Sequence, residues 1–259
     1  MVICEIDSKG IARLSLNRPE IHNAFNDEVI ALLTGHLEDL SKNDKVRVVI
    51  LTGIGKSFSA GGDLNYMRSM INYDMETNKK DAEKLADLMY RLNSLNKATI
   101  ARVNGAAYAG GVGLVSCCDI AVGTQKVVFA LTETKLGLAP ATISPYVINA
   151  IGPRQARRYF LTGELINAQK ALQIGLLHEV VPEEELDEKV DKIANILLKN
   201  GPKAIHANKL LINGVAFTKE SIERRDYTAG EIAKLRVSPE GQEGISSFLE
   251  KRPANWNKK

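Results

Sequence analysis

The sequence contains few cysteines and few aromatic residues: three of its 259 residues are cysteine and one is tryptophan. An odd number of cysteines, two of them adjacent at Cys117 and Cys118, does not build a disulfide framework. No CxxC pair or histidine-rich spacing that would bind zinc is present. The four histidines are scattered and lack triad partners, so neither a metal site nor a covalent serine mechanism is indicated.

Long apolar runs are also missing. None approaches the length of a membrane span, and no charged N-terminal segment followed by an apolar stretch marks a signal peptide. The formal net charge is +3, and the basic residues form pairs but no run, which does not favour nucleic acid as a partner. GxGxxG and P-loop spacings are absent. We therefore expect a cytoplasmic protein with neither a membrane nor a nucleic acid as partner.

Glycine, by contrast, is concentrated at a turn in the middle of the chain. Residues 101–119 read ARVNGAAYAGGVGLVSCCD and predict a buried strand, a tight turn of small residues and a short buried helix. The start of a helix has backbone N–H groups without partners, and glycine lets a ligand approach them closely. The turn can therefore hold a negatively charged atom, although close packing of a strand against a helix explains the same glycines.

A second turn repeats this arrangement. Residues 55–64, GKSFSAGGDL, follow the apolar strand Val46–Leu51 and precede a helix that Asp63 can cap. If the two turns face each other, the backbone N–H groups of Ala60 and Gly110 would converge on one oxygen and form an oxyanion hole. Such a pair would stabilise the negative charge that a thioester carbonyl develops when an enolate forms.

Glu133 is the candidate acid or base for such chemistry. It lies in residues 129–138, FALTETKLGL, between apolar strand residues and Gly137. Burial at this point would raise the pKa of its carboxyl group toward the working pH. A surface glutamate paired with Lys135 is the simpler alternative.

The order of elements predicts an α/β protein. A hairpin is expected at residues 2–6 and 11–16, and Asn26 can cap a helix that runs to about Leu40. Up to residue 150 the pattern is two strands and then a helix, repeated about three times. After residue 184 four helices follow without strands of their own to cover, so we expect contacts between subunits to bury some of their apolar faces.

Motifs in order along almost the whole chain resemble the enoyl-CoA hydratase/isomerase (crotonase) family. Their joint order and spacing are far more specific than any single motif. They are LNRPEIHNAFN at 16–26, VVILTG at 48–53, FSAGGDL at 58–64, VNGAAYAGG at 103–111, CDIAV at 118–122, ETKLGLAP at 133–140, ARRYFLTGE at 156–164 and FLEKRPANW at 248–256.

The resemblance implies a fold and a type of substrate. Residues 1–198 would form a crotonase-like spiral of repeated ββα units, and residues 199–259 would form a C-terminal helical region that makes homotrimers, often paired into homohexamers. The substrate would be an acyl-CoA thioester. Coenzyme A is then part of the substrate, and no further cofactor or metal is expected.

The same resemblance implies roles for the two turns. Ala60 and Gly110 would supply the N–H groups of the oxyanion hole, and Glu133 matches the second of two glutamates that the hydratases use. Backbone groups of the first turn would hold the adenine and pantetheine portions. The residues expected along the acyl-CoA path are Ala24, Ala60, Gly61, Gly62, Asp63, Leu64 and Gly110.

One position departs from the family pattern. Gly113 stands where the hydratases carry their first glutamate, so Glu133 is the one family carboxylate left. A single carboxylate explains a Δ3,Δ2-enoyl-CoA isomerase easily, because it can carry a proton between carbons 2 and 4. Hydration would require Glu133 to serve both steps, or another group to hold the water.

A closer likeness favours hydration. The runs GGVGLVSCCDIAV and LTETKLGLAPATISPYVINAIG resemble a bacterial branch described as methylglutaconyl-CoA hydratase-like, in leucine or acyclic terpene breakdown. Members of that branch also carry glycine at this position. We therefore expect an enoyl-CoA hydratase, which is a lyase. A methylglutaconyl-CoA-like thioester is a candidate substrate. The alternatives are the isomerase and a non-catalytic binder of CoA esters.

Overall fold

The computed structural model describes residues 1–216 and 220–257, and its larger sheet has six strands in the order β1-β2-β3-β5-β7-β10. β1 and β2 form the expected antiparallel hairpin, and every later pairing in this sheet is parallel. All residues of β3 are buried, as its continuous apolar run predicts. The strands are β1 (Val2–Ile6), β2 (Ile11–Leu16), β3 (Val48–Gly53), β5 (Ala98–Val103), β7 (Ile120–Thr124) and β10 (Glu179–Val181).

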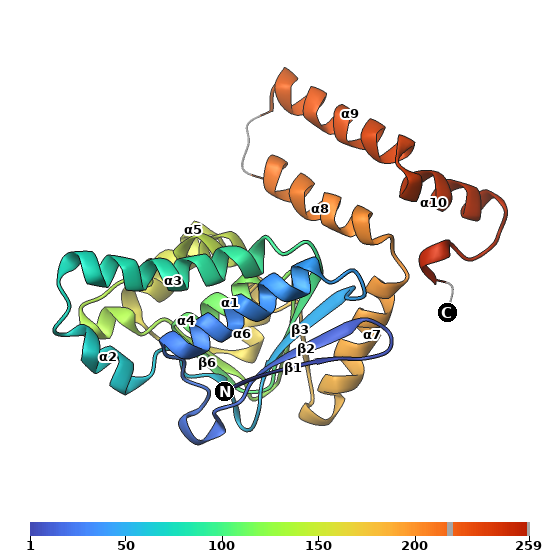
Figure 1. Cartoon of the computed structure of the whole chain (residues 1–259). Coiled ribbons are helices and arrows are strands. Elements are labelled where there is room, and N and C mark those ends of the chain that lie inside the picture. Colours follow the sequence, from blue (N-terminus) through green and yellow to red (C-terminus); the bar gives the residue numbers. More distant parts are fainter. Residues whose placement is uncertain (217–219, 258–259) are drawn as a thin grey trace.

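A second sheet of four short strands runs in the order β4-β6-β8-β9. Its members β4, β6 and β8 each follow one strand of the larger sheet, and a helix comes after each such pair. The chain thus repeats a ββα unit as it moves along both sheets, which confirms the expected spiral (Figure 1). The strands are β4 (Ser57–Ser59), β6 (Ala106–Tyr108), β8 (Val128–Ala130) and β9 (Ile166–Asn167).

Helices cover the sheets and set the positions of the two glycine-rich turns. Asn26 caps α1 by accepting a hydrogen bond from the Val29 amide, as predicted. α4 is almost entirely buried, so the second turn begins deep inside the molecule. The helices of this part are α1 (Asp27–Lys42), α2 (Leu64–Met70), α3 (Met75–Asn93), α4 (Gly110–Cys117), α5 (Ser144–Thr162), α6 (Ala168–Ile174) and α7 (Leu186–Leu198), with the 3-10 helices η1 (Pro19–Ile21), η2 (Glu133–Leu136) and η3 (Glu183–Glu185).

One helix is kinked, and one local prediction differs from the structure. α5 joins two helical segments across a kink, because Gly152 takes a positive φ of 73° and Pro153 follows it. The turn after β5 also contains the short strand β6, which the run of small residues did not indicate. β6 matters for the site because it pairs with both β4 and β8 and so fixes the two turns side by side.

The three C-terminal helices extend away from the body of the molecule (Figure 1). None of the residues in α8 (Pro202–Val215) or α9 (Ile222–Val237) is buried, and the last turn of α10 (Pro239–Leu249) contains Phe248, which is 82% exposed. The Lys209 ammonium anchors α8 to the body through the Asp119 carboxylate at 2.9 Å. The 3-10 helix η4 (Asn255–Asn257) follows. No helix in the described part of the chain is long and apolar enough to cross a bilayer.

Candidate active site

A largely apolar cavity of about 490 Å³ lies where the two glycine-rich turns meet. α2 and α3 form one wall, and η2 and the loop of residues 138–143 before α5 form the other. Four of the residues expected on the acyl-CoA path line it: Ala60, Gly62, Leu64 and Gly110. Glu133 lines it as well, so the structure brings both turns and the candidate acid or base to one cavity.

The first turn corrects one assignment. The backbone N–H of Ala60 donates to the carbonyl oxygen of His22 at 2.9 Å, so this amide is already occupied and cannot serve an oxyanion. The backbone N–H of Gly62, two residues later, donates to no described residue, although Gly62 lines the cavity. An amide at a cavity wall without a partner is the donor that an oxyanion hole requires. Gly62 therefore replaces Ala60 as the candidate donor.

The second turn supplies the other donor where expected. Gly110 begins α4, and its backbone N–H donates to no described residue. The preceding Ala109 has a φ of 47°, a left-handed conformation that is strained for alanine, and its own amide donates to the carbonyl of Ala130 at 2.9 Å. This bond to β8 holds the turn at the start of α4, where Gly110 lines the cavity.

Phe25 links the two turns, a role that the sequence did not reveal. Its backbone accepts from the Asp63 amide at 3.0 Å and donates to the Gly61 carbonyl at 2.8 Å, which clamps the first turn around Gly62. Its ring packs on the second turn so closely that a Cβ at Gly110 would lie 2.3 Å from its Cζ atom. Glycine is therefore required at position 110. One residue thus fixes the relative position of both candidate donors.

Glu133 is half-buried at the start of η2, and its Oε2 atom is buried without a hydrogen-bond partner among the described residues. Burial raises the pKa of its carboxyl group. No ion pair joins it to Lys135 within the described residues, so the alternative of a paired surface glutamate is wrong. A half-buried carboxyl group with a raised pKa and one oxygen without a partner among the described residues can both accept and release a proton.

The site lacks a second carboxylate at position 113 for a steric reason. A Cβ on Gly113 would lie 2.3 Å from Cγ2 of Ile143 and 3.2 Å from Cε of Met89. Ile143 itself lines the cavity. The isoleucine therefore fills the space into which a glutamate at position 113 would have to extend.

The other residues expected on the acyl-CoA path have structural contacts of their own. The carboxylate of Asp63 caps α2 and pairs with Arg18 at 3.0 Å. Its burial opposes ionisation, but the amides of Asn65 and Tyr66 and the Arg18 guanidinium outweigh it and lower the pKa of Asp63. The carbonyl of Ala24 accepts from Arg18 at 2.8 Å. Neither Asp63 nor Ala24 lines the cavity, and both hold the first turn in shape.

Two polar residues of the α2–α3 wall were not predicted. Tyr66 of α2 and Asp81 of α3 both line the cavity, and the Tyr66 hydroxyl donates to the Asp81 carboxylate at 2.5 Å. Each lies in a helix whose sequence reads as an ordinary surface helix. No local sequence pattern indicates this pair, because Tyr66 and Asp81 belong to different helices and meet only in the folded protein.

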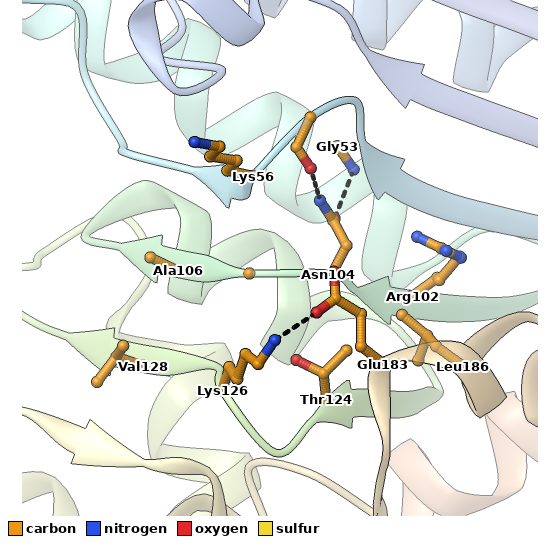
Figure 2. Close-up of a pocket in the computed structure, with 12 residues that line it drawn as sticks. Gly53, Lys56, Arg102, Asn104, Ala106, Thr124, Lys126, Val128, Glu183 and Leu186 are labelled. Carbon is orange, nitrogen blue, oxygen red and sulfur yellow. Dashed lines mark hydrogen bonds and ion pairs between the residues drawn. The ribbon is translucent and has the colours of Figure 1, made fainter.

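A larger cavity of about 630 Å³ lies elsewhere, beside the ends of β3, β5 and β7 (Figure 2). Its cations are mostly neutralised, because Lys126 pairs with Glu183 at 2.8 Å and Arg102 pairs with Asp187 at 2.8 Å. Neither the unpaired amides nor Glu133 reach it. The smaller cavity is therefore the candidate active site.

Comparisons with known proteins agree with this geometry. Residues 7–259 match the sequence model of a family described as enoyl-CoA hydratase/isomerase. The crotonyl-CoA hydratase of Syntrophomonas wolfei is 33% identical, over 98% of this chain and 97% of its own. The 2,3-dehydroadipyl-CoA hydratase of Escherichia coli is 32% identical, over 94% of this chain and 93% of its own. A crystal structure of an enoyl-CoA hydratase from Shewanella pealeana, 41% identical, matches with a TM-score of 0.96 over 98% of this chain and 95% of that one.

Proposed function

Since the chain belongs to the enoyl-CoA hydratase/isomerase family, we propose that it is a lyase that adds water across the 2,3 double bond of an enoyl-CoA thioester. One observation carries the proposal. Gly62 and Gly110, whose amides have no partner among the described residues, line the same cavity as the half-buried carboxyl group of Glu133. Donors for a developing oxyanion and a group that exchanges protons are the two requirements of enolate chemistry.

The proposed reaction uses the three groups in sequence. The thioester oxygen accepts hydrogen bonds from the amides of Gly62 and Gly110. As the oxygen of water bonds to carbon 3, its proton passes to the Glu133 carboxylate and the electron pair of the double bond moves onto the thioester as an enolate. Glu133 then returns a proton to carbon 2, which completes the addition of one water molecule.

The proposed substrate already contains coenzyme A, so the proposed reaction needs no separate cofactor. Coenzyme A enters as part of the thioester, with its adenine and pantetheine portions held along the backbone of residues 60–63, and no further cofactor or metal takes part. The sequence-based expectations of a cytoplasmic location and of no nucleic-acid partner stay predictions.

The direct test is the loss of enoyl-thioester ultraviolet absorbance with purified protein. We expect hydration by the wild type and a fall of roughly 10²- to 10⁴-fold in Glu133→Gln, the range for a lost acid or base. Glu183→Gln is the matched control, because Glu183 lies in the larger cavity, and it should retain the wild-type rate. Equal rates in wild type and Glu133→Gln would remove Glu133 from the mechanism.

The isomerase is the second candidate, and the glycine at position 113 is the observation in its favour. With one carboxylate, Glu133 could carry a proton between carbons 2 and 4 of a 3-enoyl-CoA. Fast conversion of a 3-enoyl-CoA with no incorporation of solvent oxygen would favour this activity over hydration. A protein that binds CoA esters tightly but changes neither substrate would be the non-catalytic binder.

Two kinds of acyl group are candidates. The relative from Syntrophomonas wolfei is named for crotonyl-CoA, whose acyl chain is uncharged. The relative from Escherichia coli is named for 2,3-dehydroadipyl-CoA, whose acyl chain ends in a carboxylate. A methylglutaconyl-CoA-like substrate, suggested by the sequence, would also carry a distal carboxylate. The charged side chains that line the cavity help to decide between an uncharged acyl chain and one with a distal carboxylate.

The C-terminal helices support the proposal that several copies of the chain assemble, which the family resemblance suggests to be three or six. Apolar side chains of α8 and α10 are exposed in the single chain, among them Ile212, Phe248 and Leu249. Exposed apolar surface on projecting helices is typical of faces that another subunit covers. We propose that residues 199–259 form this contact region and that residues 1–198 form the catalytic unit.

A further inference from the structure

The described lining of the cavity carries no positively charged side chain. Among the described residues that line it, none is lysine, arginine or histidine, and most of the wall is apolar. The ionisable groups that do line it are the carboxyl groups of Glu133 and Asp81 and the phenol of Tyr66. Glu133 is required for chemistry at carbons 2 and 3. Asp81, on the opposite α2–α3 wall, has no part in the proposed mechanism.

Asp81 is held rigidly and is only weakly neutralised. Its side chain is 13% exposed and accepts the hydrogen bond from the Tyr66 hydroxyl. Within the described part of the chain, the one cation paired with it is Lys84, at 3.8 Å, whose side chain is 57% exposed. A long contact to a solvated lysine compensates little of a charge that faces a cavity. The negative charge of Asp81 therefore acts on whatever lies against the α2–α3 wall of the cavity.

Tyr66 cannot offset this charge for a substrate. Burial and the nearby carboxylates of Asp81 and Asp27 raise the pKa of Tyr66, so the phenol stays protonated. Its proton is already donated to Asp81. A substrate carboxylate near this wall would therefore meet a fixed like charge, and the phenol would have no second proton to offer it.

We infer that Asp81, positioned by Tyr66, is a specificity-determining residue that restricts this enzyme to 2-enoyl-CoA thioesters whose acyl chain is uncharged. This inference rests on the proposed hydratase function and refines its substrate class. A cavity wall disfavours a charged substrate when that substrate would meet a like charge on the wall, or would have its own charge buried without a compensating partner. Acyl chains with a distal carboxylate, such as dehydroadipyl and methylglutaconyl, are disfavoured by this wall, whereas plain alkyl chains contact its apolar part.

The test compares two substrates that differ only at the end of the acyl chain. 2-Hexenoyl-CoA and 2,3-dehydroadipyl-CoA have six acyl carbons each and differ by a methyl against a carboxylate. For the wild type we expect kcat/KM to favour hexenoyl-CoA by about tenfold or more, the size of effect that one unfavourable charge contact produces. Comparable values, or a preference for dehydroadipyl-CoA, would overturn the inference.

Asp81→Asn removes the charge and keeps an oxygen that can accept from Tyr66. We expect the ratio of the two kcat/KM values to fall by about fivefold or more. Glu83→Gln is the matched control, because Glu83 is exposed on α3 outside the cavity, and it should leave the ratio unchanged. An unchanged ratio in Asp81→Asn would overturn the role of Asp81.

The failures of the two proposals are distinguishable. Hydration of neither thioester by the wild type would overturn the proposed function and the inference with it. Hydration of both at similar rates would overturn the inference alone. The wild-type ratio decides the substrate class even if Asp81→Asn does not fold, since it needs no variant.

Discussion

At the residue scale, Glu133 combines a catalytic position with a cost to stability. Burial raises the pKa of its carboxyl group. A carboxyl whose pKa is higher in the folded than in the unfolded state stabilises the fold fully below the unfolded pKa, and that contribution is lost as the pH rises through the folded pKa. At neutral pH the ionised, half-buried Glu133 therefore lowers the stability of the fold, which selection for stability alone would not favour.

Glu133→Gln should accordingly be more stable than the wild type at neutral pH. The neutral amide carries no charge to desolvate, so the melting temperature of the variant should be higher than that of the wild type. The difference should shrink as the pH falls through the raised pKa of Glu133 and vanish below the ordinary carboxyl pKa. Calorimetric melts across that pH range measure this. Glu184→Gln, at an exposed glutamate of η3, is the control and should show no such trend. A destabilised Glu133→Gln at neutral pH would contradict the burial argument.

The complementarity of Gly113 and Ile143 gives a second prediction at this scale. Gly113→Ala should destabilise the fold by about 1–3 kcal/mol, the usual cost of overpacking a core. Shortening the neighbour in Gly113→Ala/Ile143→Ala should recover part of this loss, with a favourable coupling of at least about 0.5 kcal/mol in a double-mutant cycle. Urea unfolding provides the free energies.

A control for this cycle lies in α1. A Cβ at Gly35 would meet no atom within 4 Å, so Gly35→Ala should be neutral or stabilising. Strictly additive effects of the Gly113 and Ile143 substitutions would show that the two side chains do not compete for one space.

At the element scale, the short strands of the second sheet align the site. β6 pairs with β4 on one side and with β8 on the other, so the turn that follows each strand opens on the same cavity. Phe25 completes the alignment, because its backbone clamps the first turn and its ring packs against the second. The oxyanion site is thus a product of segments around residues 25, 62 and 110 together.

Phe25→Ala should therefore impair catalysis beyond its effect on folding. Loss of one correctly placed oxyanion donor costs roughly 10²- to 10³-fold in kcat. Leu37→Ala is the matched control, since Leu37 is equally buried but faces the core from α1. Both substitutions should cost about 2–5 kcal/mol of stability. Assayed well below their melting temperatures, only Phe25→Ala should lose kcat, and an equal loss in both would contradict the role of Phe25.

The elements also show how far sequence reasoning extends. Apolar runs and caps predict β3 and α1, and the two glycine-rich turns predict an oxyanion hole, because these signals are local. The occupied amide of Ala60 could not be predicted, since its acceptor, the carbonyl of His22, comes from a distant loop. The packing of Ile143 against Gly113 is likewise a contact between elements. Such contacts between distant segments decide whether Ala60 or Gly62 can donate its amide to an oxyanion.

At the scale of the whole molecule, the exposed face of the C-terminal helices predicts assembly. Phe248→Asp places a charge where the proposed subunit contact needs an apolar side chain, and a desolvated unpaired charge at an interface is unfavourable. Light scattering after gel filtration should give the mass of three or six chains for the wild type and a smaller species for Phe248→Asp. Phe248→Leu keeps the apolar surface and should keep the wild-type mass. A monomeric wild type would refute the proposed contact region.

The fold as a whole positions two amides and one carboxyl group around a thioester. A structure with a bound, non-hydratable acyl-CoA analogue tests this claim most directly. The thioester oxygen should lie about 2.7–3.1 Å from the amide nitrogens of Gly62 and Gly110, with Glu133 beside carbons 2 and 3. The amide of Ala60 should stay bonded to His22. A thioester oxygen bound by Ala60, or an acyl group in the cavity beside Lys126, would contradict the proposed site.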